Sequence, residues 1–258
     1  MRITQCRYDP KRISKFKYFL DDNKLQNYNN KNAPAIFFGM YSGLCFKTLR
    51  DHKGLAIVIW RGTDTLKKNR LKSVIGLKNP NIKHVAISKF IIDDLKKYKL
   101  SYKFIPIPGV KINDIPVENL GNEIYAYISP KRFNFYGGHI INQIKDKIPF
   151  KININNSCDT YIREELMEVY KKSFIGLRLT EHDGIANQVV ELGLMGRRCI
   201  HNGNHPNAVP WNSVEGIIKI IKNESLKIGQ KDTVLATKVK EYINVDKQWL
   251  QTDYWSHK

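Results

Sequence analysis

Residues 173–202, SFIGLRLTEHDGIANQVVELGLMGRRCIHN, decide the fold of this chain. The apolar run that ends at Thr180 predicts a buried strand, and the run from Gly184 to Met195 predicts a helix. The run RRCIHN predicts the next strand. A strand, a helix and a second strand joined by short loops predict a parallel sheet whose crossover connection is right-handed.

The same alternation extends over most of the chain. Further strands are predicted for the apolar runs PAIFFGMY, LAIVIWRG, KHVAIS, YKFIPIPG, EIYAYIS and FKINI. Helices are predicted between them, with starts at Ser88, at about Gly138, at Asp159 or Thr160, and at a capping box of Asn212 and Glu215. We therefore expect an α/β protein of two doubly wound, Rossmann-like domains, with the active site in the cleft between them.

Charge divides the 258 residues into two parts. Residues 1–112 contain 24 Lys and Arg and seven Asp, a net charge of +17, whereas the remaining residues contain 19 basic and 17 acidic side chains. The polar segment 113–123 lies at this change and is the expected domain boundary. A basic first domain favours an anionic partner. A codon bias toward Lys, Asn and Ile in an A+T-rich genome is the alternative explanation.

Composition argues against several classes of protein. No apolar run approaches the ~18–20 residues of a membrane span, and the start of the chain lacks the apolar stretch of a signal peptide. The four cysteines, Cys6, Cys45, Cys158 and Cys199, lie far apart, which gives no recognisable zinc site and agrees with a reducing cytoplasm. The chain contains neither G-x-G-x-x-G nor G-x-x-x-x-G-K-[ST], so dinucleotide and Walker-type binding are not supported.

Ligands of open parallel sheets bind at the carboxyl ends of the strands. Five loops are expected there: Tyr41–Gly43, Arg61–Asp64, Ser129–Gly138, Glu181–Asn187 and His201–His205. Asp64 is either a general base for an acceptor hydroxyl or the cap of the next helix. The histidines of the last two loops are expected to be loop residues that can touch a nucleotide base, and no ligand spacing indicates a metal ion.

The predicted helix after Gly184 has the chemistry of an anion site. Its first backbone N–H groups, at Ile185, Ala186 and Asn187, lack partners within the helix. Because a helix start also carries a partial positive charge, these groups can bind a diphosphate.

Two carboxylates flank this expected anion site. Asp183 and Glu191 are eight positions apart and would repel phosphate, so we expect them to accept hydrogen bonds from sugar and ribose hydroxyls. Asp183 can alternatively be an N-cap, and Glu191 a solvated surface residue. Arg178, at the end of the preceding strand, reaches the diphosphate or pairs with Glu181.

The run DGIANQVVELGLMGRRCI resembles the donor-binding signature of the GT-B glycosyltransferases, in particular that of the large retaining family with the pattern E-G-F-G-L-x-x-x-E-A-x-A-x-G-x-P-V-I. The resemblance implies that Asp183 contacts the donor sugar and that Glu191 holds the ribose hydroxyls. It also implies that the amides of Gly184, Ile185, Ala186 and Asn187 meet the sugar and the diphosphate. The chain departs from the pattern at Asp183, Ala186 and Arg198.

Three further stretches resemble this family. HVAISKFIIDDLKKYKLSYKFIPIPGV is similar to the end of its N-terminal domain, and TKVKEYINVDKQWLQTDYW to its terminal helices. IYAYISPKRFNFYGG resembles the loop that usually supplies an Arg and a Lys to the diphosphate; here Lys131 and Arg132 are the candidates, and Tyr136 replaces the usual Lys. The implied domains are 1–115 for the acceptor, 116–240 for the donor, and a C-terminal helix over 241–258.

The implied activity is that of a cytoplasmic, retaining glycosyltransferase. The co-substrate is a nucleotide diphosphate sugar, with UDP or GDP as the nucleotide, and no metal or other cofactor is expected. In a retaining reaction the leaving phosphate can accept the proton, so Asp64 is not required as a base.

The basic first half leaves the acceptor open. An amphipathic basic helix that can lie on an anionic membrane is predicted from Leu66, Lys67, Lys68, Arg70, Leu71, Lys72, Val74 and Ile75. We therefore expect an anionic or a membrane-borne acceptor. The alternative is a non-catalytic protein that binds nucleic acid, although no nucleic-acid motif is recognisable. A transferase that acts on modified DNA bases would also explain the charge.

Overall fold

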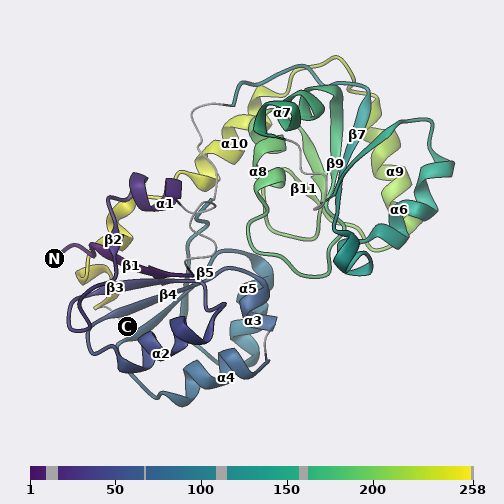
Figure 1. Cartoon of the computed structure of the whole chain (residues 1–258). Helices are drawn as coiled ribbons and strands as arrows, with labels where there is room; N and C mark the ends of the chain where they lie inside the picture. The colour runs from purple at the N-terminus through teal and green to yellow at the C-terminus, as the bar shows by residue number, and fades with distance from the viewer. Residues whose placement is uncertain (10–16, 67, 109–114, 157–161, 257–258) are drawn as a thin grey trace. The chain divides into compact units, whose positions relative to one another are not determined.

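The structure, a computed structural model (Figure 1), describes residues 1–9, 17–66, 68–108, 115–156 and 162–256. The chain forms two compact units. Unit 1 contains Met1–Lys111, His182–Ile185 and Asn244–Lys258, and unit 2 contains Ile112–Glu181 and Ala186–Ile243. The sequence predicted domain boundaries after residues 115 and 240, and the structure changes from one unit to the other after residues 111 and 243. The assignment of His182–Ile185 to unit 1 was not anticipated.

Unit 1 is built on a six-stranded parallel sheet in the order β2-β1-β3-β4-β5-β6. The strands are β1 (Gln5–Tyr8), β2 (Gln26–Asn27), β3 (Ala35–Phe38), β4 (Ala56–Trp60), β5 (Ile82–Ala86) and β6 (Tyr102–Phe104). The helices are α1 (Lys17–Asp22), α2 (Gly43–Asp51), α3 (Thr63–Leu66), α4 (Lys68–Gly76) and α5 (Lys89–Lys97). The four strands predicted in this half are confirmed, and β1 and β2 were missed.

Local sequence explains these elements. Every residue of β3 and β4 is buried, as expected for the central strands of a parallel sheet covered on both faces. Ser88 caps α5 as predicted, because its hydroxyl accepts a hydrogen bond from the Ile91 amide. Ser42 caps α2 in the same way through the Cys45 amide.

Helix α4 uses its apolar side within unit 1. Leu71 is fully buried and Val74 is 2% exposed, so these side chains belong to the core of unit 1. The helix is present, but the prediction that its apolar face is available to a membrane is wrong for Leu71 and Val74. Lys67 lies outside the described residues. Among the described residues, no helix is both long and apolar enough to cross a bilayer.

Unit 2 is built on a five-stranded parallel sheet in the order β11-β10-β9-β7-β8. The strands are β7 (Glu123–Ile128), β8 (Ile152–Asn156), β9 (Ser173–Leu177), β10 (Arg198–Ile200) and β11 (Ala208–Val209). The helices are α6 (Gly138–Ile144), α7 (Arg163–Lys172), α8 (Asn187–Leu194), α9 (Val214–Ser225) and α10 (Thr233–Ile243). All of the predicted strands are present, and the short β11 was missed.

The starts of α8 and α9 differ from their predictions. Ser213, and not the Asn212–Glu215 box, caps α9, because the Ser213 hydroxyl accepts from the Gly216 amide. Helix α8 begins at Asn187, three positions later than predicted, after the capping residue Ala186. For α7 the predicted caps Asp159 and Thr160 lie outside the described residues. The predicted C-terminal helix over 241–258 is instead the end of α10 followed by the 3-10 turns Lys247–Leu250 and Asp253–Trp255.

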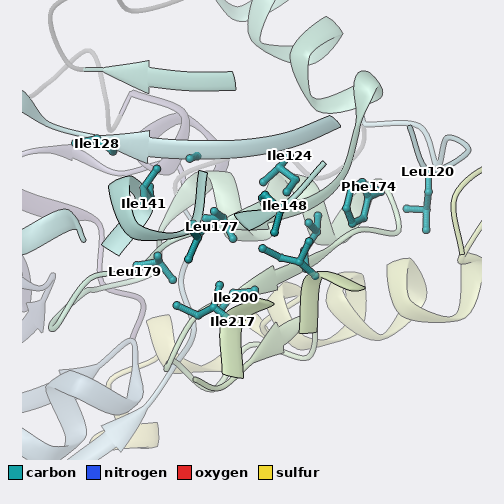
Figure 2. Close-up of a cluster of buried hydrophobic side chains, with 14 residues drawn as sticks. Leu120, Ile124, Ile128, Ile141, Ile148, Phe174, Leu177, Leu179, Ile200 and Ile217 are labelled. Carbon is teal, nitrogen blue, oxygen red and sulfur yellow. The ribbon is translucent and has the colours of Figure 1, made fainter. Parts of the chain in front are cut away.

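The core of unit 2 has two layers because successive residues of a strand face opposite sides of the sheet. Helices α6 and α9 cover one face, where the apolar cluster shown in Figure 2 includes Ile124, Ile141 and Ile217. Helices α7 and α8 cover the other face, where Tyr125 packs with Tyr170, Val189 and Leu192. The second face contains the buried polar groups of the candidate site.

Candidate functional site

Glu191 is a buried carboxylate on α8. Its side chain is 3% exposed, and its two oxygens have different partners. The Arg163 guanidinium of α7 lies 2.6 Å from Oε1, and the Tyr170 hydroxyl donates to Oε2 over 3.1 Å. The Arg163 side chain is 50% exposed, so this partner lies at the surface. The interpretation of Glu191 as a solvated surface residue is wrong.

Tyr170 is held in its role as a donor by its surroundings. Burial raises the pKa of Tyr170 well above its ordinary value, and the neighbouring Tyr125 and Glu191 act in the same direction. The Tyr125 ring packs edge-on against Tyr170 with centroids 4.9 Å apart, and Asn155 Nδ2 donates to the Tyr125 hydroxyl over 3.2 Å. A hydroxyl that stays protonated can donate only one hydrogen bond, and here it points to Glu191.

The start of α8 follows the loop that the sequence singled out. Ala186 is the capping residue, and its carbonyl accepts hydrogen bonds from the Val189 and Val190 amides. Ile185 and Ala186 therefore precede the helix, which corrects the prediction that their amides open it. The first-turn amides of α8 begin at Asn187, an exposed residue.

The carboxyl ends of β7 and β9 bring two arginines together around one tyrosine. Arg178 directly follows β9, is 7% exposed, and has its guanidinium 4.9 Å from the Tyr127 ring centre and 4.7 Å from that of Tyr136. Arg132, in the loop after β7, lies 3.7 Å from the Phe135 ring centre and 5.8 Å from that of Tyr136. We call Arg132, Arg178 and Tyr136 the arginine–tyrosine cluster.

The backbone keeps the two loops of this cluster close together. Gly137 has φ +72°, and a Cβ added there would lie 2.5 Å from the Leu179 Cβ and carbonyl oxygen. β7 and β9 are neighbours in the sheet. β8, which follows β7 in the sequence, lies on the opposite side of β7, so the strand order reverses between β7 and β9. Such a switch point is where open α/β sheets bind ligands. Lys131, the other predicted diphosphate ligand, is an exposed residue of the same loop.

The histidine loop after β10 is buried. His201 is fully buried and His205 is 4% exposed, and their rings lie 5.8 Å apart between centroids. The His201 Nδ1 atom is 3.2 Å from the Arg178 carbonyl oxygen, so this loop packs beside the strand end that carries Arg178. Within the part of the chain that the structure describes, no three His, Cys, Asp or Glu side chains are grouped as metal ligands.

Asp64 in unit 1 has the geometry of a cap. Its side chain is fully buried, and its carboxylate accepts hydrogen bonds from the backbone amides of Met40, Arg61 and Gly62 at 2.9–3.2 Å. Burial raises the pKa of Asp64, and these amides oppose the rise. The carboxylate thus joins the loop after β3 to the loop after β4, which agrees with the capping alternative.

Asp183 and Gly184 pack with unit 1. The Ser88 hydroxyl donates to the Asp183 carbonyl over 2.8 Å, and Asp183 Oδ1 accepts from the Gly184 amide over 2.9 Å. A Cβ at Gly184 would clash with the Arg61 carbonyl oxygen, so only glycine permits this close approach. Glu191, Arg132 and Arg178 belong to unit 2.

Sequence reasoning missed several partners of these groups. Neither the Tyr170 hydroxyl nor Arg163 was connected to Glu191. Thr65 and Asp94, which contact His182 in unit 1, had no sequence signal beyond their helical surroundings. Such contacts depend on how distant segments pack, and no local pattern reports them.

Comparison with known proteins identifies the fold. No protein-family model and no curated protein sequence matches the chain. Among solved structures, Anabaena HepE in complex with UDP and glucose is similar at 10% identity and a TM-score of 0.66, over 99% of this chain and all of HepE. TarM is similar at 13% identity and a TM-score of 0.56, and sucrose-phosphate synthase from Thermosynechococcus elongatus at 11% and 0.53.

The extent of these matches differs between the neighbours. The TarM match covers 93% of this chain but only 56% of TarM, so the chain spans just over half of that protein. The match to sucrose-phosphate synthase covers 96% of this chain and 76% of that one. With two parallel α/β sheets and these neighbours, the chain has the fold of the GT-B glycosyltransferases.

Proposed function

We propose that the chain is a glycosyltransferase that moves a sugar from a nucleoside diphosphate sugar to an acceptor hydroxyl. The observation that carries this proposal is Glu191, a buried carboxylate on the helix after β9 in a GT-B fold. Its partners are side chains rather than backbone amides, and one of them is half exposed. A ribose hydroxyl can therefore replace Arg163 as a donor to Glu191 without breaking backbone structure.

The arginine–tyrosine cluster is the proposed site of the diphosphate. Guanidinium groups bind phosphate oxygens in a planar, two-pronged geometry, and Arg132 and Arg178 come from neighbouring strand ends. Lys131 adds an exposed positive charge beside them, and the Asn187 amide of α8 adds a donor. Asp183 and Gly184 are the proposed contacts of the donor sugar, as the family resemblance implies.

The proposed reaction needs charge stabilisation more than a protein base. The bond between the anomeric carbon and the phosphate oxygen breaks, and its electron pair leaves with the nucleoside diphosphate. The acceptor oxygen bonds to the anomeric carbon with retention of the anomeric configuration, and its proton passes to the leaving diphosphate. Arg132 and Arg178 stabilise the charge that develops on the diphosphate. None of the roles proposed for these residues requires a metal ion. Asp64 takes no part in the proposed proton transfer.

The proposed acceptor is anionic. Residues 1–112 carry a net charge of +17, and a positive field attracts acidic substrates and raises their rate of encounter. A membrane-borne acceptor is the second version of this proposal. Flotation with liposomes that contain acidic lipid should recover more protein than flotation with neutral liposomes, and equal recovery would contradict the membrane version.

A thermal-shift screen tests the proposed function. Uridine, guanosine, adenosine and thymidine diphosphates and their sugar conjugates are the ligands, with UDP first because the HepE structure contains it. We expect one nucleotide to raise the melting temperature of the wild type. The shift should disappear in Glu191→Gln and persist in the matched control Glu168→Gln, whose side chain is 61% exposed on the neighbouring helix. A wild type that responds to none of these nucleotides, or a Glu191→Gln variant that responds fully, contradicts the proposal.

A further inference from the structure

A buried polar cluster in unit 1 holds the short segment that carries Asp183 and Gly184. It consists of Thr65 of α3, Asp94 of α5 and His182, and we call it the Asp94 cluster. The Thr65 hydroxyl lies 2.6 Å from Asp94 Oδ2, and the His182 Nε2 atom lies 2.8 Å from the same oxygen. All three residues are at most 8% exposed.

The carboxylate at the centre of the cluster is ionised. Burial opposes the charge on Asp94, but hydrogen bonds from His182 and Thr65 outweigh it and lower the pKa of this carboxyl to about 2. The Lys97 ammonium adds a contact at 3.2 Å to the other oxygen, at the exposed side of the cluster. A charged acceptor makes stronger hydrogen bonds than a neutral one, so His182 is firmly held.

The backbone beside His182 is fixed from two more directions. The Ser88 hydroxyl, at the start of α5, donates to the Asp183 carbonyl, and Gly184 lies against the Arg61 and Gly62 backbone. The Phe90 ring packs 5.6 Å from the His182 ring. Thr65 of α3 and Asp94 of α5, which are 29 positions apart, thus act through His182 on the two residues that follow it.

Stability alone is a poor explanation of this arrangement. A buried ionised group is costly to desolvate, and an apolar core of similar volume is often as stable, so such clusters are better suited to specifying one conformation. The conformation specified here is that of the Asp183–Gly184 backbone, next to His182 in the chain.

We propose that Asp94 and Thr65 are positioning residues for the donor sugar, because they hold His182 and thereby fix the loop that presents Asp183 and Gly184. The inference rests on the proposed function, in which Asp183 and Gly184 contact the donor sugar. Loss of the cluster should therefore weaken recognition of the sugar and leave recognition of the nucleotide intact.

Binding and turnover of UDP and UDP-glucose by the full chain test this inference. In the wild type, the glucose should change the affinity relative to UDP alone. In Asp94→Asn and Thr65→Val this difference should shrink and kcat should fall about tenfold, the loss expected for one charge-assisted hydrogen bond, while the Kd of UDP stays unchanged. Thr65→Ser keeps the hydroxyl and should behave like the wild type.

Asp93→Asn is the matched control. Asp93 neighbours Asp94 on α5, its side chain is 48% exposed, and its partner is the surface residue Lys89, so the variant removes the same charge without touching the cluster. It should keep wild-type binding and turnover. Wild-type values for Asp94→Asn and Thr65→Val, or an equal loss in Asp93→Asn, would overturn the inference.

Amide hydrogen exchange separates this inference from the proposed function. Exchange at Gly184 and Ile185 should be faster in Asp94→Asn and Thr65→Val than in the wild type, with no ligand present. Unchanged exchange overturns the positioning role, whatever the chain binds. A wild type that binds none of the nucleoside diphosphates or sugar conjugates of the thermal-shift screen contradicts the proposed function, and with it the role of the cluster toward a sugar.

Discussion

Asp64 in unit 1 and Glu191 in unit 2 are both buried carboxylates on a helix that follows a strand of a parallel sheet. Asp64 accepts all of its described hydrogen bonds from backbone amides, those of Met40, Arg61 and Gly62. Glu191 accepts from two side chains, Arg163 and Tyr170. The two carboxylates are thus buried to nearly the same extent, and they differ in the kind of group that donates hydrogen bonds to them.

This difference separates a structural carboxylate from one suited to a ligand. Backbone amides cannot leave Asp64 without unfolding the loops after β3 and β4, because their positions are fixed by the chain. The Arg163 side chain is half exposed, so it can rotate away from Glu191 without a change in the backbone. A buried carboxylate whose partner is a side chain at the surface is therefore a better candidate for ligand binding than one that accepts hydrogen bonds from the backbone amides of loops.

The largest effect is expected for Asp64→Ala. The variant leaves the backbone amides of Met40, Arg61 and Gly62 without their acceptor, and we expect a loss of about 3 kcal/mol or more in the free energy of unfolding. Denaturant titration measures it, with the exposed Asp51→Ala as a control. A stable Asp64→Ala variant that has lost only its transferase activity would instead support the role of Asp64 as a base.

A second effect of similar size is the pH dependence of stability that we expect from His84, another buried residue of unit 1. Burial lowers the pKa of His84 to about 4, and the Trp60 indole N–H donates to its Nδ1 atom. The folded state therefore resists protonation of His84, and stability should fall as the pH decreases from about 6.5 to about 4, by about 3 kcal/mol in total. His84→Gln should flatten this slope, whereas substitution of the exposed His139 in unit 2 should not. Identical slopes in all three proteins would contradict this account.

Glu191→Gln should affect binding more than folding. Loss of the charge removes a strong acceptor for ribose hydroxyls, and we expect UDP affinity to fall about tenfold or more. The melting temperature should change less than in Asp64→Ala, because the amide oxygen still accepts a hydrogen bond. Calorimetric titration gives the affinity. A variant that unfolds as readily as Asp64→Ala but binds UDP normally when folded would reverse the comparison.

The smallest effect is the coupling between Arg163 and Glu191. A double-mutant cycle with Arg163→Met and Glu191→Gln should give a coupling free energy of about 1 kcal/mol, since Arg163 is half exposed and water screens the pair. This modest value is what allows a ligand to replace Arg163. A coupling several times larger would mean that the pair is a fixed structural bridge.

The fold could be predicted where the sequence pattern is strong. AIFF and AIVIW are continuous apolar runs and were recognised as buried strands, whereas QCRY, QN and AV are short or polar and were missed. The capping hydroxyl of Ser88 was recognised from its residue type and position. The start of α8 was misplaced because Ala186, its cap, has no side-chain acceptor and thus no signature.

The candidate site could be predicted only in part. Arg178 was named from its position at a strand end, Arg132 from the family resemblance, and Glu191 from its spacing to Asp183 and from that resemblance, but their partners were not named. The bonds from Arg163 and Tyr170 join residues more than twenty positions apart, and the contact between Asp94 and His182 spans 88 positions. Tertiary packing sets such contacts, and the assignment of His182–Ile185 to unit 1 follows from the same packing.

A crystal structure of the chain with UDP tests the central claim most directly. We predict that the ribose hydroxyls lie about 3 Å from the Glu191 carboxylate, with Arg163 displaced from at least one oxygen and Arg178 facing the diphosphate. A structure in which UDP binds elsewhere, while Glu191 keeps both Arg163 and Tyr170, would contradict it.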